Sequence, residues 1–279
     1  MQPELPPDPR GLFDLSGRVA LVTGATRGLG LAIATGYAAA GAHVIVVSRK
    51  AEACETVVAA LRARGRAASA APCHVGRWRE VEALVAEVYR EFGGIDVLVN
   101  NAGISPLYGH VSEVSEEHWD KVLSVNLKGP FRLAALIGTR MAAGRGGSII
   151  NVSSTGAARP TADIVPYAAA KAGLNAMTVG LADAFGPQVR VNAIMPGPFL
   201  TSIARNWDLE MLARRSETFP LRRAGEAHEI VGAALYLATD ASSFTTGAVL
   251  TVDGGAQWSM PGGGAARDRN GAAVREARA

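Results

Sequence analysis

The sequence predicts a single-domain α/β fold in which a parallel sheet is covered by helices on both faces. Two observations support this prediction. Short apolar runs rich in β-branched residues alternate along the chain with longer amphipathic or alanine-rich segments. These short runs are apolar on both sides, which is typical of parallel strands buried between two layers of helices. Right-handed crossovers between such strands give a doubly wound, Rossmann-type sheet.

Length and composition fit one such domain. The chain has 279 residues, of which 48% are hydrophobic and 19% are charged, so it can bury a large core. Doubly wound folds of roughly 200 to 250 residues commonly form one domain. We expect the domain to span residues 11–258. Residues 1–10, with four prolines, and residues 259–279, rich in Gly, Ala and Arg, are expected to be flexible ends.

Six segments are expected to be strands, and the segments between them helices. The clearest helix runs from Val81 to Phe92, because its apolar residues recur at spacings of three and one and form a single stripe. Two longer helical segments are expected over Glu116–Met141 and Tyr167–Phe185. The expected strands are Val19–Thr23, His43–Val47, Val97–Asn100, Ser148–Val152, Val189–Ala193 and Val249–Val252.

Charge and cysteine content narrow the class of protein. The net charge is +3, and residues 259–279 alone carry four Arg against one Asp and one Glu. The rest of the chain is therefore nearly neutral, and no nucleic-acid partner is expected. Cys54 and Cys73 are too few for a disulfide framework, and the N-terminus has no apolar signal-like stretch. No apolar run is long enough to cross a membrane. We therefore expect a soluble, cytoplasmic protein.

A glycine-rich turn follows the first expected strand. Gly24, Gly28 and Gly30 have the spacing GxxxGxG and lead into a helical segment. Glycines let the backbone approach a pyrophosphate, and the helix N-terminus presents free N–H groups. Taken alone, the turn is equally well explained as purely structural, because the chain contains 32 glycines.

Three further residues point to acid–base chemistry. Tyr167 and Lys171 are four residues apart on one expected helix, so the ammonium can lie near the phenol and lower its pKa from about 10. For this pair alone an ordinary surface contact is the simpler explanation. Ser154 follows an apolar strand, at the sheet edge where open α/β folds bind ligands, and its hydroxyl can donate to a substrate carbonyl oxygen.

Taken together and in order, these motifs resemble the short-chain dehydrogenase/reductase family over about residues 13–258. The matching elements are the glycine turn, Asn100-Asn101-Ala102-Gly103, Asn126, Ser154, Tyr167 with Lys171, and Pro196-Gly197 with Thr201. The resemblance implies that Asn126, Ser154, Tyr167 and Lys171 are catalytic, Asn126 by distorting its helix and holding a water that relays protons toward Lys171. The offset of 13 residues from Tyr167 favours Ser154 over Ser153, which is expected to bond to backbone.

The resemblance also implies where the cofactor binds. Contacts are expected from the glycine turn, from the ends of the second to fourth strands, from the Tyr–Lys pair and from the segment after the sixth strand. The residues are Gly24, Thr26, Arg27, Gly28, Leu29, Gly30, Ser48, Arg49, Val75, Asn101, Ala102, Gly103, Tyr167, Lys171, Pro196, Gly197, Phe199 and Thr201.

The end of the second strand favours NADP(H). An acidic residue there would bind the ribose 2′-hydroxyl of NAD, whereas arginine can pair with a 2′-phosphate. Ser48 occupies this position, Arg49 follows it, and Arg27 lies in the glycine turn. The alternative is three solvated polar residues in a loop.

One position departs from the family pattern. The family commonly has Asp-Val after the third strand to contact adenine, and this chain has His74-Val75. The backbone of Val75 is still expected to serve, while His74 could face either adenine or solvent. No Cys, His or Asp spacing suggests a metal site.

The function expected from these residues is NADP(H)-dependent interconversion of a ketone and a secondary alcohol, with Tyr167 as general acid and base. The stretch from Pro220 to Gly255 resembles 3-oxoacyl-carrier-protein reductase-like members, a resemblance that sugar-alcohol and steroid dehydrogenases share, and the expected substrate is an apolar or acyl-type carbonyl compound because of the apolar segment over residues 199–219. Polyol, sugar and steroid dehydrogenases of the family are alternatives. A non-catalytic NADP-binding regulator is an alternative of another class, and a nucleotide-sugar epimerase is disfavoured by the glycine spacing. The resemblance also implies a homotetramer packed through the two long helices.

A segment rich in large apolar residues follows the Pro196-Gly197 turn. In the family such a segment is a mobile lid over the substrate, and Ile104, Pro106 and Tyr108 could complete an apolar pocket. The alternative is that its side chains belong to the core or to a tetramer interface. The segment covers residues 199–219 and contains Phe199, Leu200, Ile203, Trp207, Leu209, Met211, Leu212 and Phe219.

Overall fold

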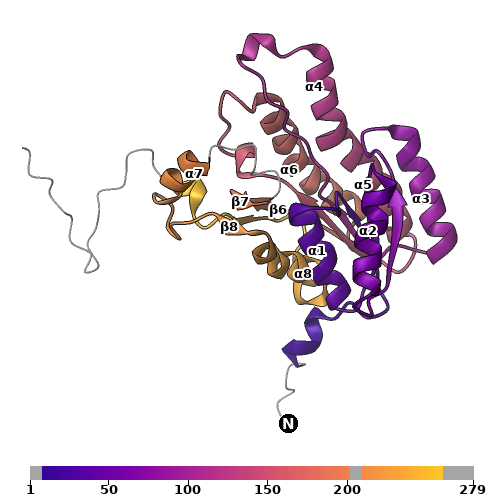
Figure 1. Ribbon diagram of the computed structural model, residues 1–279. Coiled ribbons are helices and arrows are strands. Elements are labelled where there is room, and N and C mark those ends of the chain that lie inside the picture. Colours follow the sequence, from indigo (N-terminus) through magenta and orange to yellow (C-terminus); the bar gives the residue numbers. More distant parts are fainter. Residues whose placement is uncertain (1–7, 202–208, 260–279) are drawn as a thin grey trace, which may run out of the picture.

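A parallel sheet of seven strands forms the centre of the structure, a computed structural model that describes residues 8–201 and 209–259 (Figure 1). The strand order is β3-β2-β1-β4-β5-β6-β9, so the direction of winding reverses between β1 and β4. The strands are β1 (Val19–Thr23), β2 (His43–Ser48), β3 (Ala68–Pro72), β4 (Val97–Asn100), β5 (Gly147–Val152), β6 (Val189–Pro196) and β9 (Val249–Val252).

Helices cover both faces of the sheet, because alternate residues of each strand point to opposite sides. One face packs against α1 (Gly28–Ala39), α2 (Ala51–Arg62) and α8 (Val231–Ala238). The other packs against α3 (Trp78–Phe92), α5 (Gly129–Ala142) and α6 (Val165–Phe185). The prediction of a doubly wound, single-domain sheet is confirmed.

The six expected strands are present, three with the expected bounds and three longer by one to three residues at one end, and β3 completes the sheet. The sequence of β3 is ASAAP, which lacks the β-branched residues that mark the others. Its strand conformation comes from pairing with β2 in the register Val44↔Ala68 to Ser48↔Pro72. Pro72 is tolerated there because it stands at the end of an edge strand.

The expected helix over Glu116–Met141 is interrupted. It consists of α4 (Glu116–Leu123), a π-helical turn (Ser124–Lys128) and α5. The expected helices over Val81–Phe92 and Tyr167–Phe185 are present as α3 and α6, each beginning a little earlier. The π-helical turn contains Asn126, so the distortion implied by the family resemblance is present at that residue.

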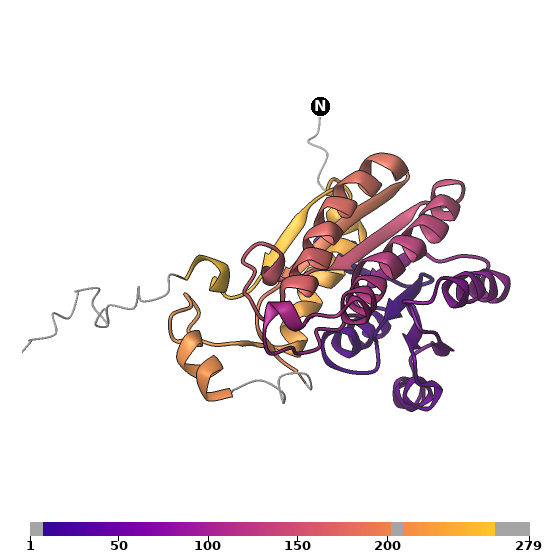
Figure 2. The same cartoon turned by 90° about the horizontal axis from the view of Figure 1, so that it is seen from above.

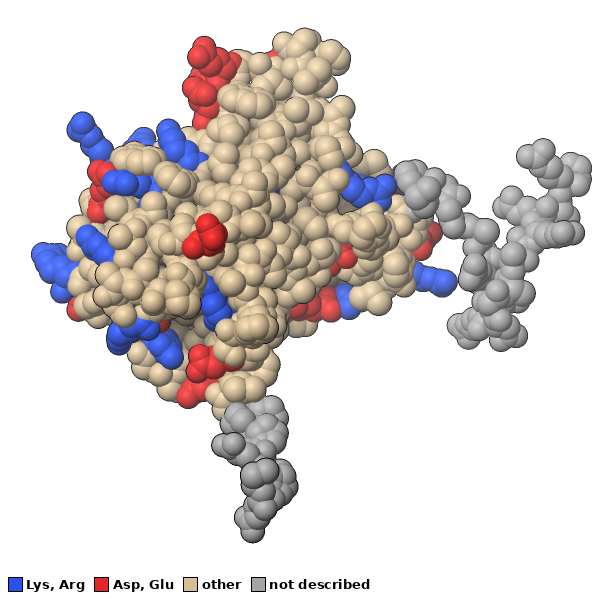
Figure 3. Space-filling view, turned by 180° about the vertical axis from the view of Figure 1, so that it is seen from behind, with Lys and Arg blue, Asp and Glu red and all other residues tan. Residues whose placement is uncertain are grey.

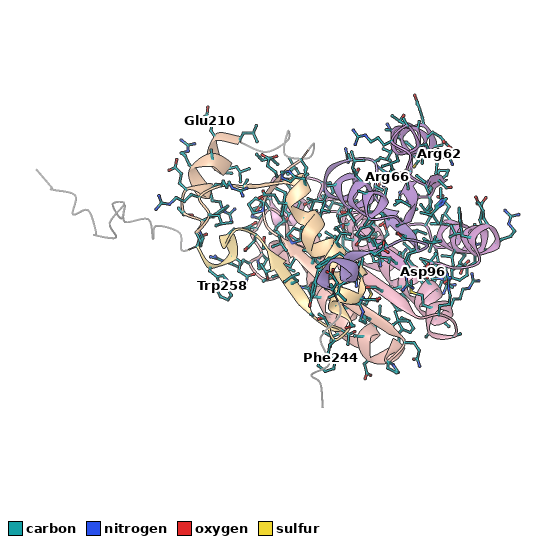
Figure 4. The ribbon with its side chains drawn as sticks, turned by 90° about the horizontal axis from the view of Figure 1, so that it is seen from below. Arg62, Arg66, Asp96, Glu210, Phe244 and Trp258 are labelled. Atoms are coloured by element: carbon teal, nitrogen blue, oxygen red, sulfur yellow. The ribbon has the colours of Figure 1, made fainter. Side chains whose placement is uncertain are left out.

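A small group of elements projects from the main body of the molecule (Figures 1 and 2). It consists of α7 (Leu209–Ser216) and the two paired strands β7 (Phe199–Leu200) and β8 (Gly225–Glu226). Figure 4 places Glu210 and Trp258 at this end of the molecule. Phe199 and Phe219 are buried, so for these two residues the lid interpretation is wrong and the core alternative holds. Leu209 and Met211 are exposed. Ile203 and Trp207 lie outside the described residues.

The described residues begin at Asp8. Pro9–Phe13 form a 3-10 turn, so the described fold includes Pro9 and Arg10; residues 1–7 and 260–279, which make up most of the two expected flexible ends, lie outside the described residues. Within residues 8–201 and 209–259, no helix has the length and apolar character needed to cross a bilayer. On the face drawn in Figure 3, basic side chains gather toward one end with acidic side chains among them.

Candidate active site

The expected site residues converge at one edge of the sheet. Most follow the carboxyl ends of β1 to β6 or lie in the first turn of the next helix, whereas Asn126 lies in the π-helical turn after α4 and Lys171 in the second turn of α6. β1 and β4 are neighbours at the point where the winding reverses, which in an open α/β sheet is where a crevice is expected beside the turns that follow them. Ligands of open α/β sheets bind at such a crevice.

The glycine turn packs tightly against the loop after β4. Gly24 has a φ of +67°, and a Cβ there would lie 2.8 Å from Asn101 Nδ2 and 3.0 Å from Ala102 Cα. A Cβ on Gly30 would lie 2.3 Å from the Gly24 carbonyl oxygen. Only glycine fits at these two positions, so the first purpose of the turn is close backbone packing. This packing brings the start of α1 to the crevice.

Thr23 fastens the two loops, a role that the sequence did not predict. Its buried hydroxyl donates to the Val99 carbonyl (3.1 Å) and accepts from the N–H groups of Asn101 (2.9 Å) and Ala102 (3.0 Å). Asn101 Nδ2 donates to the Thr23 carbonyl at 2.8 Å. The side-chain amide of Asn101 is therefore committed to the protein, and a cofactor contact from this residue would come from its backbone.

The N-terminus of α1 suits a pyrophosphate. Arg27 is the extended N-cap residue and makes no side-chain cap, so the first N–H groups of the helix have no capping side chain. The positive end of the helix dipole lies in the same place. A dinucleotide bound here would have its pyrophosphate at Gly28, Leu29 and the backbone around them.

Two exposed arginines flank the end of β2. Thr26 Oγ1 donates to Ser48 Oγ at 3.3 Å, which links the glycine turn to this strand end. Arg27 and Arg49 are exposed, and within the described ranges neither forms an ion pair. The structure thus leaves two guanidinium groups near Ser48 available to a phosphate.

Ser154 and Tyr167 are brought together at the end of β5. Both side chains approach Gly156: Ser154 Oγ and Tyr167 Cε1 lie 3.4 Å and 3.8 Å from where a Cβ on Gly156 would be, and Ser154 Oγ accepts from the Gly156 N–H at 3.1 Å. Ser153 is buried instead and donates to the backbone carbonyl of Lys171 at 3.3 Å, as the sequence predicted for a residue that bonds to backbone. Ser154 is therefore the serine that can meet a substrate beside Tyr167.

Lys171 is buried one helical turn after Tyr167. Its Nζ donates to the Val152 carbonyl at 2.7 Å and lies 5.8 Å from the centroid of the Tyr167 ring. Burial lowers the pKa of Lys171 to about 8. The Lys171 side chain thus reaches the C-terminal end of β5.

The predicted lowering of the phenol's pKa by the ammonium is wrong for the protein alone. Burial raises the pKa of Tyr167, and the hydrogen bond from Ser154 is what lowers it in part. The physical reason is that the low-dielectric surroundings disfavour the charged forms of both Tyr167 and Lys171.

Asn126 supports the loop after β4 from the π-helical turn. Its Oδ1 accepts from the Ile104 N–H (3.0 Å), and its Nδ2 donates to the carbonyls of Ile104 (2.8 Å) and Val122 (3.0 Å). A Cβ on Gly103 would lie 2.8 Å from Asn126 Oδ1 and 3.6 Å from Lys171 Nζ. Gly103, Asn126 and Lys171 therefore lie close together.

A buried amide network below the site was also missed by the sequence reasoning. Asn100 Nδ2 donates to Asn151 Oδ1 (3.0 Å), and Asn151 Nδ2 donates to Thr178 Oγ1 (2.9 Å). This network ties the ends of β4 and β5 to α6. The signal in the sequence was an asparagine within an apolar run, since buried amides need partners.

The segment after β6 closes the crevice. Thr201 contacts the glycine turn, since its Cβ lies 3.3 Å from where a Cβ on Gly28 would be. The N–H of Gly197 donates to the Val252 carbonyl at 3.0 Å, and Pro196 is buried. Phe199, expected to contact the cofactor, is buried in the core and packs against Gly225, so a contact from Phe199 would involve its backbone.

His74 and Val75 differ in their surroundings. Val75 is buried, whereas His74 is partly exposed and its Nδ1 accepts from the Gly76 N–H at 3.2 Å. The His74 N–H donates to Glu80 Oε2 at 2.8 Å. In the described part of the chain, no group of three or more His, Cys, Asp and Glu side chains is placed to hold a metal ion.

Comparison with known proteins gives consistent matches over most of the chain. A family model described as enoyl-(acyl carrier protein) reductase matches residues 24–257. Human dehydrogenase/reductase SDR family member 4 is 39% identical over 244 residues, covering 86% of this chain and 88% of the relative. D-threitol dehydrogenase of Mycolicibacterium smegmatis is 38% identical over 245 residues, covering 87% and 94%.

A solved structure agrees with the arrangement of the elements. The gluconate 5-dehydrogenase of Burkholderia cenocepacia, in complex with NADP and tartrate, superposes with a TM-score of 0.85 at 34% identity. The match covers 89% of this chain and 98% of that one.

Proposed function

This chain belongs to the short-chain dehydrogenase/reductase family, and from this premise we propose that it is an NADP(H)-dependent oxidoreductase that interconverts a ketone and a secondary alcohol. The observation that carries the proposal is the placement of Ser154 and Tyr167 side by side at Gly156, with Lys171 Nζ buried 5.8 Å from the centroid of the Tyr167 ring. A hydroxyl that donates and a phenol that exchanges a proton are the two groups that a carbonyl needs in this chemistry.

NADP(H), when bound, supplies or accepts the hydride. We propose that Gly28 and Leu29 hold its pyrophosphate at the N-terminus of α1, and that Arg27 and Arg49 pair with the 2′-phosphate beside Ser48. The exposure of both guanidinium groups and the absence of an acidic side chain at Ser48 support this assignment.

In the direction of reduction, Tyr167 gives its hydroxyl proton to the substrate's carbonyl oxygen and Ser154 donates a hydrogen bond to the same oxygen. In the direction of oxidation, the Tyr167 phenolate takes the alcohol proton. With a pKa of about 8, Lys171 is mainly an ammonium at neutral pH. In the protein alone burial outweighs this charge in setting the pKa of Tyr167, and we propose that the charge stabilises the phenolate once proton transfer has formed it. Asn126 holds Ile104 and lies beside Lys171, as the proposed proton relay requires.

The substrate is proposed to be apolar or acyl-like near its carbonyl. Ile164 lies over Gly156: its Cδ1 is 2.9 Å from where a Cβ on Gly156 would be, and Ser154 Oγ is 3.4 Å from that point. The Ile164 side chain therefore lies next to the Ser154 hydroxyl and favours apolar substituents on the ketone.

A series of ketones of increasing chain length, followed by NADPH absorbance, tests this proposal. Each added methylene that becomes buried should raise kcat/KM by up to roughly fourfold, equivalent to about 0.8 kcal/mol, until the pocket is filled. Polyhydroxylated ketones should be poor substrates. A flat profile with faster turnover of sugar ketones would contradict an apolar pocket.

A polyol or sugar dehydrogenase is the second candidate, because the similar proteins include a D-threitol dehydrogenase and a gluconate 5-dehydrogenase. Faster oxidation of a polyol than of an apolar secondary alcohol would favour it. Failure to oxidise NADPH with any ketone, simple diketones included, would instead favour a non-catalytic NADP-binding regulator.

We also propose a homotetramer. The exposed apolar residues Trp119 on α4, Phe131 on α5 and Val179 on α6 are available for packing between subunits. Light scattering at micromolar concentration should give four times the chain mass of 28.9 kDa. A mass equal to that of one chain would contradict the proposal.

A further inference from the structure

Tyr108 joins two loops that reach the site from different strands. It lies in the loop between β4 and α4, and its hydroxyl donates to the Ala162 carbonyl at 2.6 Å. The same hydroxyl accepts from the Val165 N–H at 2.8 Å. Ala162 belongs to the loop after β5, and Val165 is the first residue of α6. One hydroxyl therefore bridges the two loops on either side of the candidate site.

The start of α6 has no cap of its own. Its N-cap residue, Ile164, provides no side-chain hydrogen bond, and Pro166 has no N–H to donate. The first N–H groups of a helix lack partners within the helix, so one must be supplied from elsewhere. Tyr108 supplies it for Val165, which makes Tyr108 a cap provided by a distant loop.

This cap lies next to the reacting groups. Tyr167 is two residues after Val165, in the first turn of α6. Ile164 packs against Gly156 at the point where Ser154 Oγ and the Tyr167 ring also approach, 3.4 Å and 3.8 Å from the place of a Cβ on Gly156. A shift of the first turn would therefore move the Tyr167 hydroxyl relative to Ser154.

The loop that carries Tyr108 is itself anchored. At its start, Asn126 bonds both the N–H and the carbonyl of Ile104. Further along, the Tyr108 ring meets the edge of His118, with ring centroids 5.5 Å apart at an interplanar angle of 80°. The Tyr108 hydroxyl is therefore carried by a loop that has tertiary contacts of its own. It can restrain the first turn of α6 instead of moving with it.

We propose that Tyr108 is a positioning residue for the reaction proposed above, on which this inference rests. Its hydroxyl fixes the first turn of α6, and through that turn it keeps the Tyr167 side chain next to Ser154. Because this contact lowers the pKa of the phenol, Tyr108 also affects the pH range in which Tyr167 can act.

The test is Tyr108→Phe in the full chain, with Tyr89→Phe as the matched control. Tyr89 is also partly buried, and its hydroxyl donates to a backbone carbonyl, that of Ile137, between α3 and α5. Tyr108→Phe should lower kcat for a ketone by about tenfold, leave the NADPH dissociation constant unchanged, and shift the pH profile of kcat upward. Amide exchange of Val165 should accelerate. Tyr89→Phe should change none of these properties.

The outcomes separate this inference from the proposed function. If the wild-type protein reduces ketones but Tyr108→Phe keeps its kcat and pH profile, the positioning role is wrong although the function stands. If the wild-type protein reduces no ketone, the proposed function fails, and unchanged exchange of the Val165 amide would overturn the cap as well.

Discussion

Replacing Tyr167 with phenylalanine should lower turnover by about 10²- to 10⁴-fold while the protein stays folded and binds NADPH as before. The substitution removes the hydroxyl that we propose exchanges the proton and leaves the ring, which is partly buried against its neighbours. The Ser154 hydroxyl would then remain as the only side-chain donor proposed to meet the carbonyl oxygen.

Turnover of a ketone at saturating NADPH, with thermal unfolding and NADPH titration of the same variant, measures this effect. Tyr89→Phe, which removes a hydroxyl far from the crevice, should keep full activity. Substantial turnover by a folded Tyr167→Phe protein would exclude Tyr167 as the proton donor.

Arg49→Ala should weaken NADPH binding by roughly 10- to 150-fold and leave NADH binding almost unchanged. A charge-assisted hydrogen bond to a phosphate contributes about 1.5 to 3 kcal/mol, and only NADPH carries the 2′-phosphate. The exposed guanidinium beside Ser48 makes no competing ion pair within the described residues.

Fluorescence titration with both cofactors measures the two affinities. Arg66→Ala removes the same charge from an exposed position at the other end of the sheet, ahead of β3, and should have little effect (Figure 4). Equal affinity of the wild-type protein for NADH and NADPH would show that the 2′-phosphate is not recognised.

The strands and the site motifs could be predicted because each depends on a local pattern. Runs such as Val19–Thr23 are apolar on both sides, and the glycine turn, Tyr167 and Lys171 have fixed spacings. β3 lacked such a pattern, since its alanines take strand conformation from their pairing with β2. When a segment becomes a strand because it pairs with a neighbouring strand, its own composition gives little indication of that conformation.

Tertiary hydrogen bonds account for what the sequence could not predict. Thr23 and Tyr108 bond to backbone groups about 55 to 80 residues away, and no spacing in the sequence marks such partners. The burial of Phe199 and the direction of the pKa shift of Tyr167 likewise depend on the surrounding packing. The sequence pattern placed Tyr167 and Phe199 at the site, but the contacts of their side chains depend on the three-dimensional fold.

The most direct test of the proposed chemistry follows the hydride of NADPH into the product. The wild-type protein would be incubated with an apolar ketone and NADPH carrying deuterium at both C4 positions, and the product would be analysed by mass spectrometry. We expect a secondary alcohol with one deuterium on the carbinol carbon and a hydroxyl proton from solvent. Alcohol without deuterium, or no alcohol from any ketone in the series, would contradict hydride transfer by this protein.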